Sequence, residues 1–343
     1  MYTNYILHDR LRVCLVGQSW PAEFYHWIKD SQVRETMQRI ATETEEDFKQ
    51  LISVLEKLQI QVLRPKVDLD VDSLQESGNI LDIPTPPMCP GDNMILLGDR
   101  LIESISTAPY SVIHQQAYHP FFSHVRAQGN HILTTDNISI STAQCFQFED
   151  RIFYGKMKHQ SHTEMMQAWK NLTEKSIVGF HLDGHIDGWF CPVSPGLIVT
   201  SSDPERPSLL SLFYKTHFKN WKIVYCDPTL YQDPTFRRWQ KENSGSWWVP
   251  GEEQNHEFIK FVDIYFKNWV GDVSETVFEV NMIVVDDKTV IVRKTNYSNN
   301  LKIIQELENH GITVYQVPFR HSNFWDAGIN CVTMAVHRSN HNQ

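Results

Sequence analysis

The chain has 343 residues, 41% of them hydrophobic, which is enough for a substantial core in one large domain or two average ones. Its formal net charge is -10 and it has no Lys/Arg-rich run, which argues against a nucleic-acid or anionic-membrane partner and favours a small solute. No apolar run approaches the roughly 20 residues of a membrane helix, so we expect a cytoplasmic protein without a membrane partner.

Short segments rich in Val, Ile, Leu and Tyr recur along the chain between Gly, Pro and Asp residues, and they predict strands that end in turns. They are Arg12–Gly17, Gln61–Pro65, Asn93–Ser104, Asn130–Thr135, Arg151–Tyr154, Ser176–Phe190, Gly196–Ser201, Lys222–Cys226, Val277–Arg293, Thr313–Pro318 and Asn330–His337. Three hairpin turns are expected, at Gly98-Asp99, Pro195-Gly196 and Asp286-Asp287.

Segments with apolar residues at helical spacing lie between these strands. They are Glu35–Leu58, Ser111–Gln128, His162–Leu172, Pro207–His217, Asn255–Asn268 and Asn299–His310. A hairpin, a helix and a further strand thus recur about five times, without a visible sequence repeat or a Gly/Ser/Pro linker. This pattern predicts one pseudo-repetitive α/β domain over residues 1–343.

The segment Asp227–Pro250 is the least regular part of the pattern. Its Trp247-Trp248 pair admits two interpretations, an aromatic lid over a pocket or a long loop held down by its own aromatic side chains. The second interpretation is favoured, because buried aromatic anchors are common in long loops.

The stretch His181-Leu-Asp-Gly-His-Ile-Asp187 has an ionisable side chain at every second position. In a strand, His181, Asp183, His185 and Asp187 would share one face. Such a face suits a metal site, thiol or acid/base chemistry, or plain structural polarity, and the stretch alone does not decide among them. If the stretch forms a metal site, the candidates for a further ligand are Asp92, Asp326 and His321.

Two other motifs carry chemistry. Cys331 follows Gly328 and precedes a strand-like segment, so the turn can expose its thiol to a pocket, and a charged His185 would favour the thiolate. Asp92 ends the rigid run Pro86-Pro-Met-Cys-Pro-Gly-Asp92, which delivers a carboxylate to the mouth of a hairpin. The six cysteines contain no CxxC pair, and Cys89 and Cys191 are interpreted as packing residues.

The order of these motifs resembles the arginine:glycine amidinotransferases, which belong to the guanidino-group-modifying enzymes, or penteins. The resemblance rests on Asp92, His185-Ile-Asp187 before Pro195-Gly196, Asn281 on a strand before Asp286-Asp287-Lys288, and Cys331-Val-Thr333. It implies a five-bladed α/β propeller of pseudo-symmetric ββαβ units and catalysis without a metal or cofactor. It also implies that Cys331 is the nucleophile, His185 the general acid/base, and Asp187 and Asp92 the carboxylates that hold a guanidinium.

The implied reaction moves the amidino group of arginine, or of a related guanidine, onto Cys331 and then to an amine acceptor. The partners are therefore a small guanidine donor and a small amine acceptor, and a homodimer is compatible with the sequence. Two alternatives stay open: a guanidine hydrolase or deiminase, in which water replaces the amine, and a catalytically silent pentein that binds a guanidino compound. Stoichiometric zinc and activity lost to a chelator would instead indicate a metal hydrolase.

The sequence departs from the family pattern at several positions. Ser141 and Gln144 are neutral where relatives have carboxylates, Gly91 replaces the usual arginine before Asp92, and Asn330 replaces the common histidine before the nucleophile. Different support for the acid/base group, a different substrate or a loss of activity would each account for this. The expected substrate-binding residues are Asp92, Ser141, Gln144, Asn281, Asn330 and Asp183, the last of which also suits a supporting or structural role together with His181.

Overall fold

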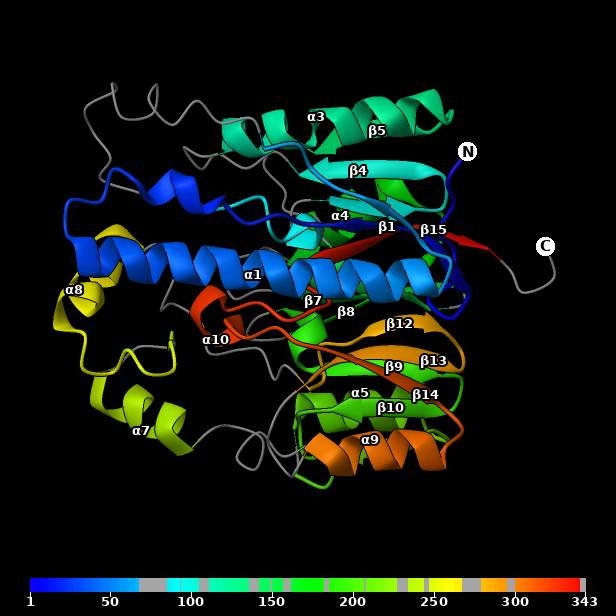
Figure 1. The fold of residues 1–343 in the computed structure, drawn as a ribbon. Helices are drawn as coiled ribbons and strands as arrows, with labels where there is room; N and C mark the ends of the chain where they lie inside the picture. Colours follow the sequence, from blue (N-terminus) through cyan, green and yellow to red (C-terminus); the bar gives the residue numbers. More distant parts are fainter. Residues whose placement is uncertain are drawn as a thin grey trace.

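The structure is a computed structural model that describes residues 1–67, 85–92, 94–104, 111–135, 142–148, 150–156, 162–181, 185–206, 208–226, 234–243, 247–266, 279–294 and 300–339. Five three-stranded sheets, flanked by helices, make up the body of these residues (Figure 1). Each sheet has the same plan, which is an inner strand antiparallel to a middle strand that is parallel to an outer strand.

One unit illustrates why this plan arises. Strand β3 (Met94–Leu97) turns through Gly98 and Asp99 into β4 (Arg100–Ser104), because Gly98 supplies the positive φ that the tight turn needs. A parallel third strand requires a long crossover, which helix α3 (Ser111–Ala127) provides before β5 (His131–Thr135). Hairpin, helix and strand therefore form one ββαβ unit.

Three further units repeat the plan in chain order. The first has β6 (Cys145–Phe148), β7 (Arg151–Lys156), α4 (His162–Leu172) and β8 (Ser176–His181). The second has β9 (Phe190–Ser194), β10 (Leu197–Thr200), α5 (Leu209–His217) and β11 (Lys222–Tyr225). The third has β12 (Ile283–Asp286), β13 (Thr289–Arg293), α9 (Asn300–Asn309) and β14 (Thr313–Val317).

The remaining unit joins distant parts of the chain. Its middle strand β1 (Arg10–Val16), helix α1 (Ser31–Lys57) and outer strand β2 (Gln61–Leu63) come early in the sequence. Its inner strand is β15 (Thr333–Ser339), which pairs antiparallel with β1. This pairing closes the ring of five units and brings the segment just before β15 beside the early elements.

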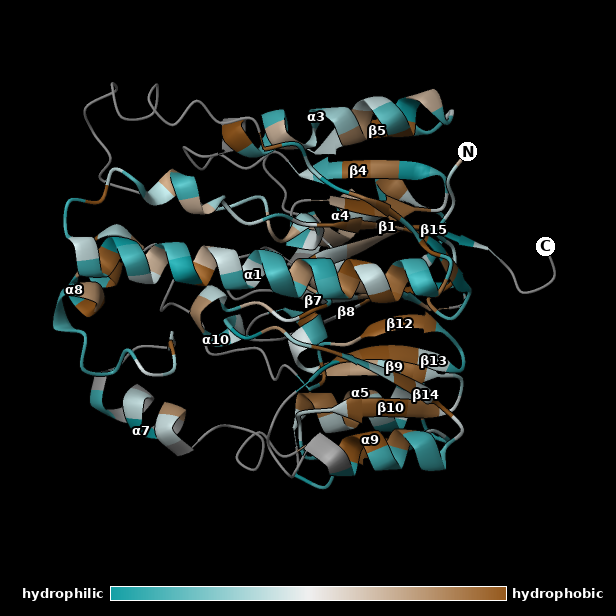
Figure 2. Cartoon of the chain, viewed as in Figure 1, coloured by the Kyte–Doolittle hydropathy of each residue, from teal (hydrophilic) through white to brown (hydrophobic). Residues whose placement is uncertain are grey.

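The inner strands of all five sheets line one cavity of about 100 Å³. They are β3, β6, β9, β12 and β15, which lie together at the centre of the ring. The expected five-bladed α/β propeller of ββαβ units is confirmed by this arrangement. The hydropathy of the elements agrees with this arrangement. The strands are largely hydrophobic, whereas α1 alternates between hydrophobic and hydrophilic residues along its length (Figure 2).

Helix α1 shows how local sequence signals set an element. Its N-terminus is capped by Asp30, whose side chain accepts a hydrogen bond from the Val33 amide. Its buried residues recur three or four positions apart, as in Met37, Ile40 and Thr44, so that one face packs on the core. No helix within the described ranges has both the length and the apolar character needed to cross a lipid bilayer.

Shorter elements complete the fold. They are η1 (Ala22–Tyr25), η2 (Pro90–Asp92), η3 (Thr142–Gln144), η4 (Ile186–Gly188), α7 (Pro234–Asn243), α8 (His256–Tyr265) and α10 (Ser322–Trp325). The expectation of an irregular segment at 227–250 is wrong for α7, whose periodic Phe236 and Trp239 are buried. Trp247 and Trp248 are also buried in the main core cluster, which confirms the packed-loop interpretation.

Element boundaries depart from the expectations at two places that matter for the site. The third hairpin turns at Asp287-Lys288, one residue later than expected, because Asp286 pairs with Thr289. Asn281 lies two residues before β12 begins and is not on a strand. The Asn281 side chain contacts the turn that contains Asn330 and Cys331.

Candidate active site

The stretch from His181 to Asp187 is not a single strand. Strand β8 ends at His181, whereas His185 has an extended backbone and is followed by the 3-10 turn η4, which contains Asp187. The expectation that four ionisable residues share one strand face therefore fails, because β8 ends at His181 and the next strand, β9, begins only at Phe190. Asp183 lies outside the described residues, and so does Ser141.

Asp92 is brought to the site by another short turn. It ends η2, immediately before the β3 hairpin, as the Pro-rich run predicted. The turns η2, η3 and η4 lie side by side, and η2 also contacts β15. Three turns from three different units thus converge on the start of the strand that follows Cys331.

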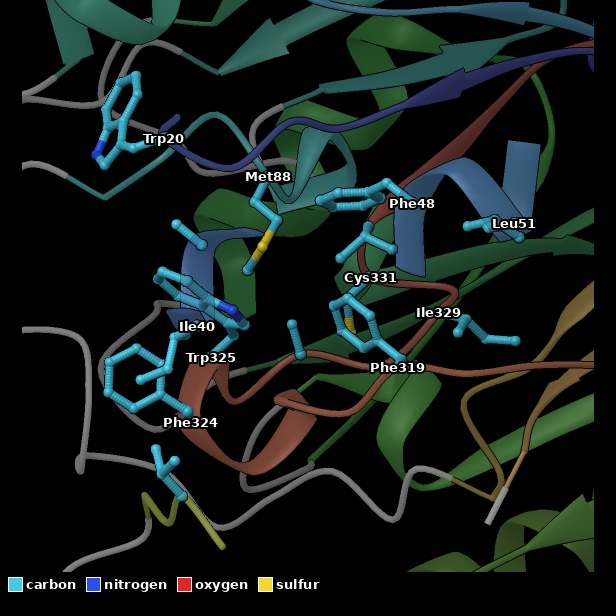
Figure 3. Close-up of a cluster of buried hydrophobic side chains, with 14 of the residues drawn as sticks. Trp20, Ile40, Phe48, Leu51, Met88, Phe319, Phe324, Trp325, Ile329 and Cys331 are labelled. Carbon is cyan, nitrogen blue, oxygen red and sulfur yellow. The ribbon is translucent and has the colours of Figure 1, made fainter. Parts of the chain in front are cut away.

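Cys331 lies in the turn just before β15 and is only 6% exposed. Figure 3 shows it at a cluster of apolar side chains, among them Phe48, Phe319 and Met88. These come from α1 and from segments that flank the turn, so the thiol faces a largely apolar wall on one side. Polar groups occupy its other side.

The polar side is a small network of amides and one carboxylate. The Cys331 thiol lies 3.5 Å from Asp187 Oδ2 and donates toward it. Asn330 Nδ2 donates to the same oxygen at 2.9 Å, and Asn281 Nδ2 donates to Cys331 Sγ at 3.1 Å. The structure therefore brings together Cys331, Asp187, Asn281 and Asn330, four of the residues singled out in the sequence.

The charges around the thiol disfavour its ionised form. Burial raises the pKa of the Cys331 thiol well above its ordinary value, and the negative charges of Asp187, Cys89 and Asp92 raise it further. The Gly328 backbone lowers it by hydrogen bonding. Without a bound cation, Cys331 is therefore held as a neutral thiol at physiological pH.

Asp92 has an unusual titration. Burial raises the pKa of its carboxyl from 3.8 to about 6, His185 opposes that rise, and Asp187 adds to it. The Asp92 carboxyl therefore lies close enough to His185 and Asp187 to interact electrostatically with both. Asp92 Oδ1 and Asp187 Oδ1 are both buried and have no hydrogen-bond partner among the described residues. Two half-buried carboxyl groups, each with one buried and unused oxygen, form an incomplete site that favours a hydrogen-bonding cation.

Two further residues named from the sequence, Gln144 and His321, have hydrogen-bond partners outside the network around Cys331. Gln144 is buried in η3, and its Oε1 accepts a hydrogen bond from the Tyr154 hydroxyl at 3.3 Å. His321 is turned to α1, where its Nε2 lies 2.6 Å from Glu43 Oε2. The described ranges contain no group of three or more His, Cys, Asp or Glu side chains that could hold a metal ion.

Sequence reasoning missed two features of the site. Cys89 packs against the main core cluster, as expected, but it also belongs to the surroundings of the site, because burial and then the charges of Asp92 and Asp187 raise the pKa of its thiol well above its ordinary value. The sequence did contain a signal for this, because Cys89 lies in the Pro-rich run that ends at Asp92. The second is that Asn281 contacts Cys331 directly, for which the sequence contained no signal because the two residues are fifty positions apart.

No protein-family model matches the chain. It is 20% identical over 340 residues to inosamine-phosphate amidinotransferase 1 of Streptomyces glaucescens, covering 88% of this chain and 82% of that protein. The structure resembles the inosamine-phosphate amidinotransferase StrB1 of Streptomyces griseus, with a TM-score of 0.65 and 16% identity over 99% of this chain and 97% of that one.

Two further solved structures extend the comparison. SxtG, an amidinotransferase of the saxitoxin biosynthetic pathway from Microseira wollei, matches with a TM-score of 0.68 and 14% identity over 99% and 98% of the two chains. DDAH from Pseudomonas aeruginosa matches with a TM-score of 0.55 and 9% identity over 95% and 99%. The chain accordingly shares its fold with these amidinotransferases and with DDAH.

Proposed function

We propose that this protein is an amidinotransferase that carries an amidino group on Cys331 between a guanidine donor and an amine acceptor. The observation that carries the proposal is the pair of half-buried carboxyl groups of Asp92 and Asp187, each with one buried and unused oxygen, in the surroundings of the thiol. A guanidinium presents its N–H donors in a plane, so it can satisfy both oxygens and be fixed next to sulfur.

The bound cation also changes the charge balance at the thiol. Asp92 and Asp187 disfavour the thiolate when the site is empty, and a guanidinium between them offsets that repulsion. The thiol then loses its proton to solvent, the thiolate attacks the central carbon, an S–C bond forms, and the C–N bond to the departing amine breaks. His185 is the general acid that protonates this amine, and it later removes a proton from the incoming one.

The surroundings of Cys331 support transfer to an amine. Its apolar neighbours, which include Phe48 and Phe319 (Figure 3), keep water away from one side of the thiol, so that an S-amidino intermediate can persist until an acceptor arrives. Arginine is the proposed donor on the strength of the family resemblance. The names of the two Streptomyces proteins make inosamine phosphates reasonable members of an acceptor screen.

The test is intact-protein mass spectrometry after acid quench, with wild type and Cys331→Ala each incubated with arginine. Ornithine, citrulline and ammonia are assayed in the same samples. We expect an amidino adduct in wild type alone, with release of ornithine, and no turnover by the folded variant. A Cys331→Ala protein with full activity contradicts the mechanism. Citrulline or ammonia formed without an acceptor identifies a hydrolase or deiminase instead.

One observation favours a second candidate, a silent guanidine-binding pentein. Gln144 is neutral where the amidinotransferases have an acid, and its side-chain oxygen is already bonded to Tyr154. It therefore adds no negative charge to the site. This candidate predicts that arginine raises the unfolding temperature of the protein while neither adduct nor product forms.

A further inference from the structure

Asn281 makes three hydrogen bonds to the turn that carries Cys331. Its Oδ1 accepts from the backbone amides of Asn330 at 2.8 Å and Cys331 at 3.2 Å. Its Nδ2 donates to Cys331 Sγ at 3.1 Å. The side chain is fully buried, so each of these groups would lack a water partner if the amide were removed.

The orientation of this amide follows from its partners. An asparagine can often be reversed, because its oxygen and nitrogen look alike. Here two backbone N–H groups point at one end of the side chain, and that end must be the acceptor oxygen. The other end is then the NH₂ group, and it must face the sulfur. The donor toward Cys331 Sγ is fixed by the backbone and does not depend on the state of the thiol.

Gly328 shows that the fold makes room for Asn281. A Cβ atom at position 328 would lie 2.2 Å from Asn281 Oδ1 and 2.5 Å from its Cγ. No side chain at position 328 is compatible with that distance, so the observed position of the Asn281 amide requires a glycine there. Any larger residue at 328 would push the amide away from the turn.

We propose that Asn281 is a catalytic residue that holds Cys331 in place and stabilises its thiolate through the Nδ2–H···Sγ hydrogen bond. The inference rests on the proposed role of Cys331 as the nucleophile. Asp187 and Asp92 place negative charge beside the sulfur, and Asn281 supplies a neutral donor that a bound cation does not displace. The earlier expectation that Asn281 binds substrate differs, because it predicts weaker substrate binding with unchanged thiol reactivity.

The test uses Asn281→Asp, which keeps the oxygen that accepts both backbone amides and replaces the donor by a second oxygen. The rate of iodoacetamide alkylation at Cys331 is measured at pH 8.5 by peptide mass spectrometry, with Cys331→Ser to confirm the assigned peptide. A like charge beside sulfur raises the thiol pKa by roughly one unit or more, so alkylation should slow about tenfold or more. Turnover should fall by about 10²–10³, as for loss of one preorganised donor.

Asn171→Asp is the matched control. Asn171 lies on the exposed face of α4, and its side-chain oxygen accepts from Gln167 Nε2, a bond that aspartate retains. It adds the same charge away from the thiol and should leave alkylation unchanged. Asn281→Ser removes the amide donor without adding a charge, so it separates the loss of the donor from the effect of the new carboxylate, and it should also slow alkylation.

A folded Asn281 variant that is alkylated at the wild-type rate would overturn the proposal, and a higher KM in that variant would point to substrate binding. The alkylation assay needs no substrate, so its result is separate from the proposed function. Slow alkylation in Asn281→Asp, together with no arginine adduct in wild type, would support the role of Asn281 and reject arginine as the donor.

Discussion

Cys331 and Asp92 show how single residues are tuned by the groups around them. Burial and neighbouring negative charge raise the pKa of both side chains, so each is closer to neutral than it would be in water. For Asp92 this has a cost to the fold. A charged carboxylate with one oxygen buried and unbonded destabilises the empty protein, and a cationic ligand relieves that destabilisation.

The destabilisation of the fold by the Asp92 carboxylate depends on pH. The folded-state pKa of Asp92 is about 6, against an ordinary value of 3.8. Between these values the folded protein binds more protons than the unfolded chain, so the contribution of Asp92 to stability falls as pH rises through roughly 4 to 6. Above pH 6 both states are ionised and the full penalty remains. The binding of a guanidinium should in turn weaken as pH falls below about 6.

Asp92→Asn should therefore stabilise the protein while it impairs ligand binding. We expect a gain of about 1–3 kcal/mol at pH 7.5, from one to two pKa units at 1.36 kcal/mol each, and a smaller gain at pH 4.5. Thermal unfolding at the two pH values measures it. Asp203→Asn is the control, because Asp203 Oδ1 accepts from the Glu205 amide at the surface and asparagine keeps that bond. Equal gains at both pH values would contradict the assignment.

At the scale of elements, α1 supports the segment that leads to the nucleophile. The indole N–H of Trp325 donates to Thr44 Oγ1 at 2.9 Å within the core. Arg320 forms a salt bridge with Asp47 at 2.9 Å, and its backbone amide donates to the same carboxylate at 2.7 Å. Helix α1 and the segment around α10 are thus fixed to each other ahead of Cys331, as Figure 3 shows for their apolar side chains.

Thr44→Val tests this contact with almost no change of shape. The valine leaves the buried indole N–H of Trp325 without its acceptor, so we expect a loss of about 1–3 kcal/mol in the free energy of unfolding, measured in urea. Thr42→Val is a close control. Both threonines donate to the carbonyl one turn earlier, at 2.7 Å for Thr44 and 2.8 Å for Thr42, but Thr42 is on the exposed face. Equal losses in the two variants would argue against a role for the indole bond.

At the scale of the whole molecule, we propose that residues 1–343 behave as one domain. The reason is that β15 closes the sheet of β1 and β2 and also joins it to the unit that contains β12. Arg338 of β15 is buried, and it donates to the carbonyls of Asp9 at 2.8 Å, Val284 at 2.7 Å and Val285 at 3.4 Å. Burial lowers its pKa to about 10, which still leaves it charged at neutral pH.

Arg338→Met should weaken the entire ring. Three carbonyls lose a charged donor, and we expect a loss of about 2–4 kcal/mol from the free energy of unfolding. Unfolding followed by tryptophan fluorescence and by circular dichroism should give one coincident transition in wild type and variant. Arg12→Met is the control, because Arg12 lies on β1 opposite β15 and makes a bond to Ser339 nearer the surface. Two separate transitions in wild type would reject the single domain.

The sequence by itself determined most of the local structure. Hairpins, helices and their recurring order follow from period-two and helical spacing and from turn residues such as Gly98, and these depend on neighbours within one element. The predicted helix His162–Leu172 coincides with α4, and the bounds of the other predicted helices shift by a few residues, whereas the predicted strand Ser176–Phe190 ends at His181. Motif order also pointed to Asp92, Asp187 and Cys331 as members of one site.

Only the tertiary structure decided how these groups meet. The convergence of η2, η3 and η4 on Cys331 depends on ring closure between β1 and β15, and that pairing has no local signal. The same holds for the bond between Asn281 and Cys331 and for the effect of the carboxylates on the Cys89 thiol. The physical reason is that burial and electrostatic fields arise from atoms far apart in the chain, whereas spacing reports only on near neighbours.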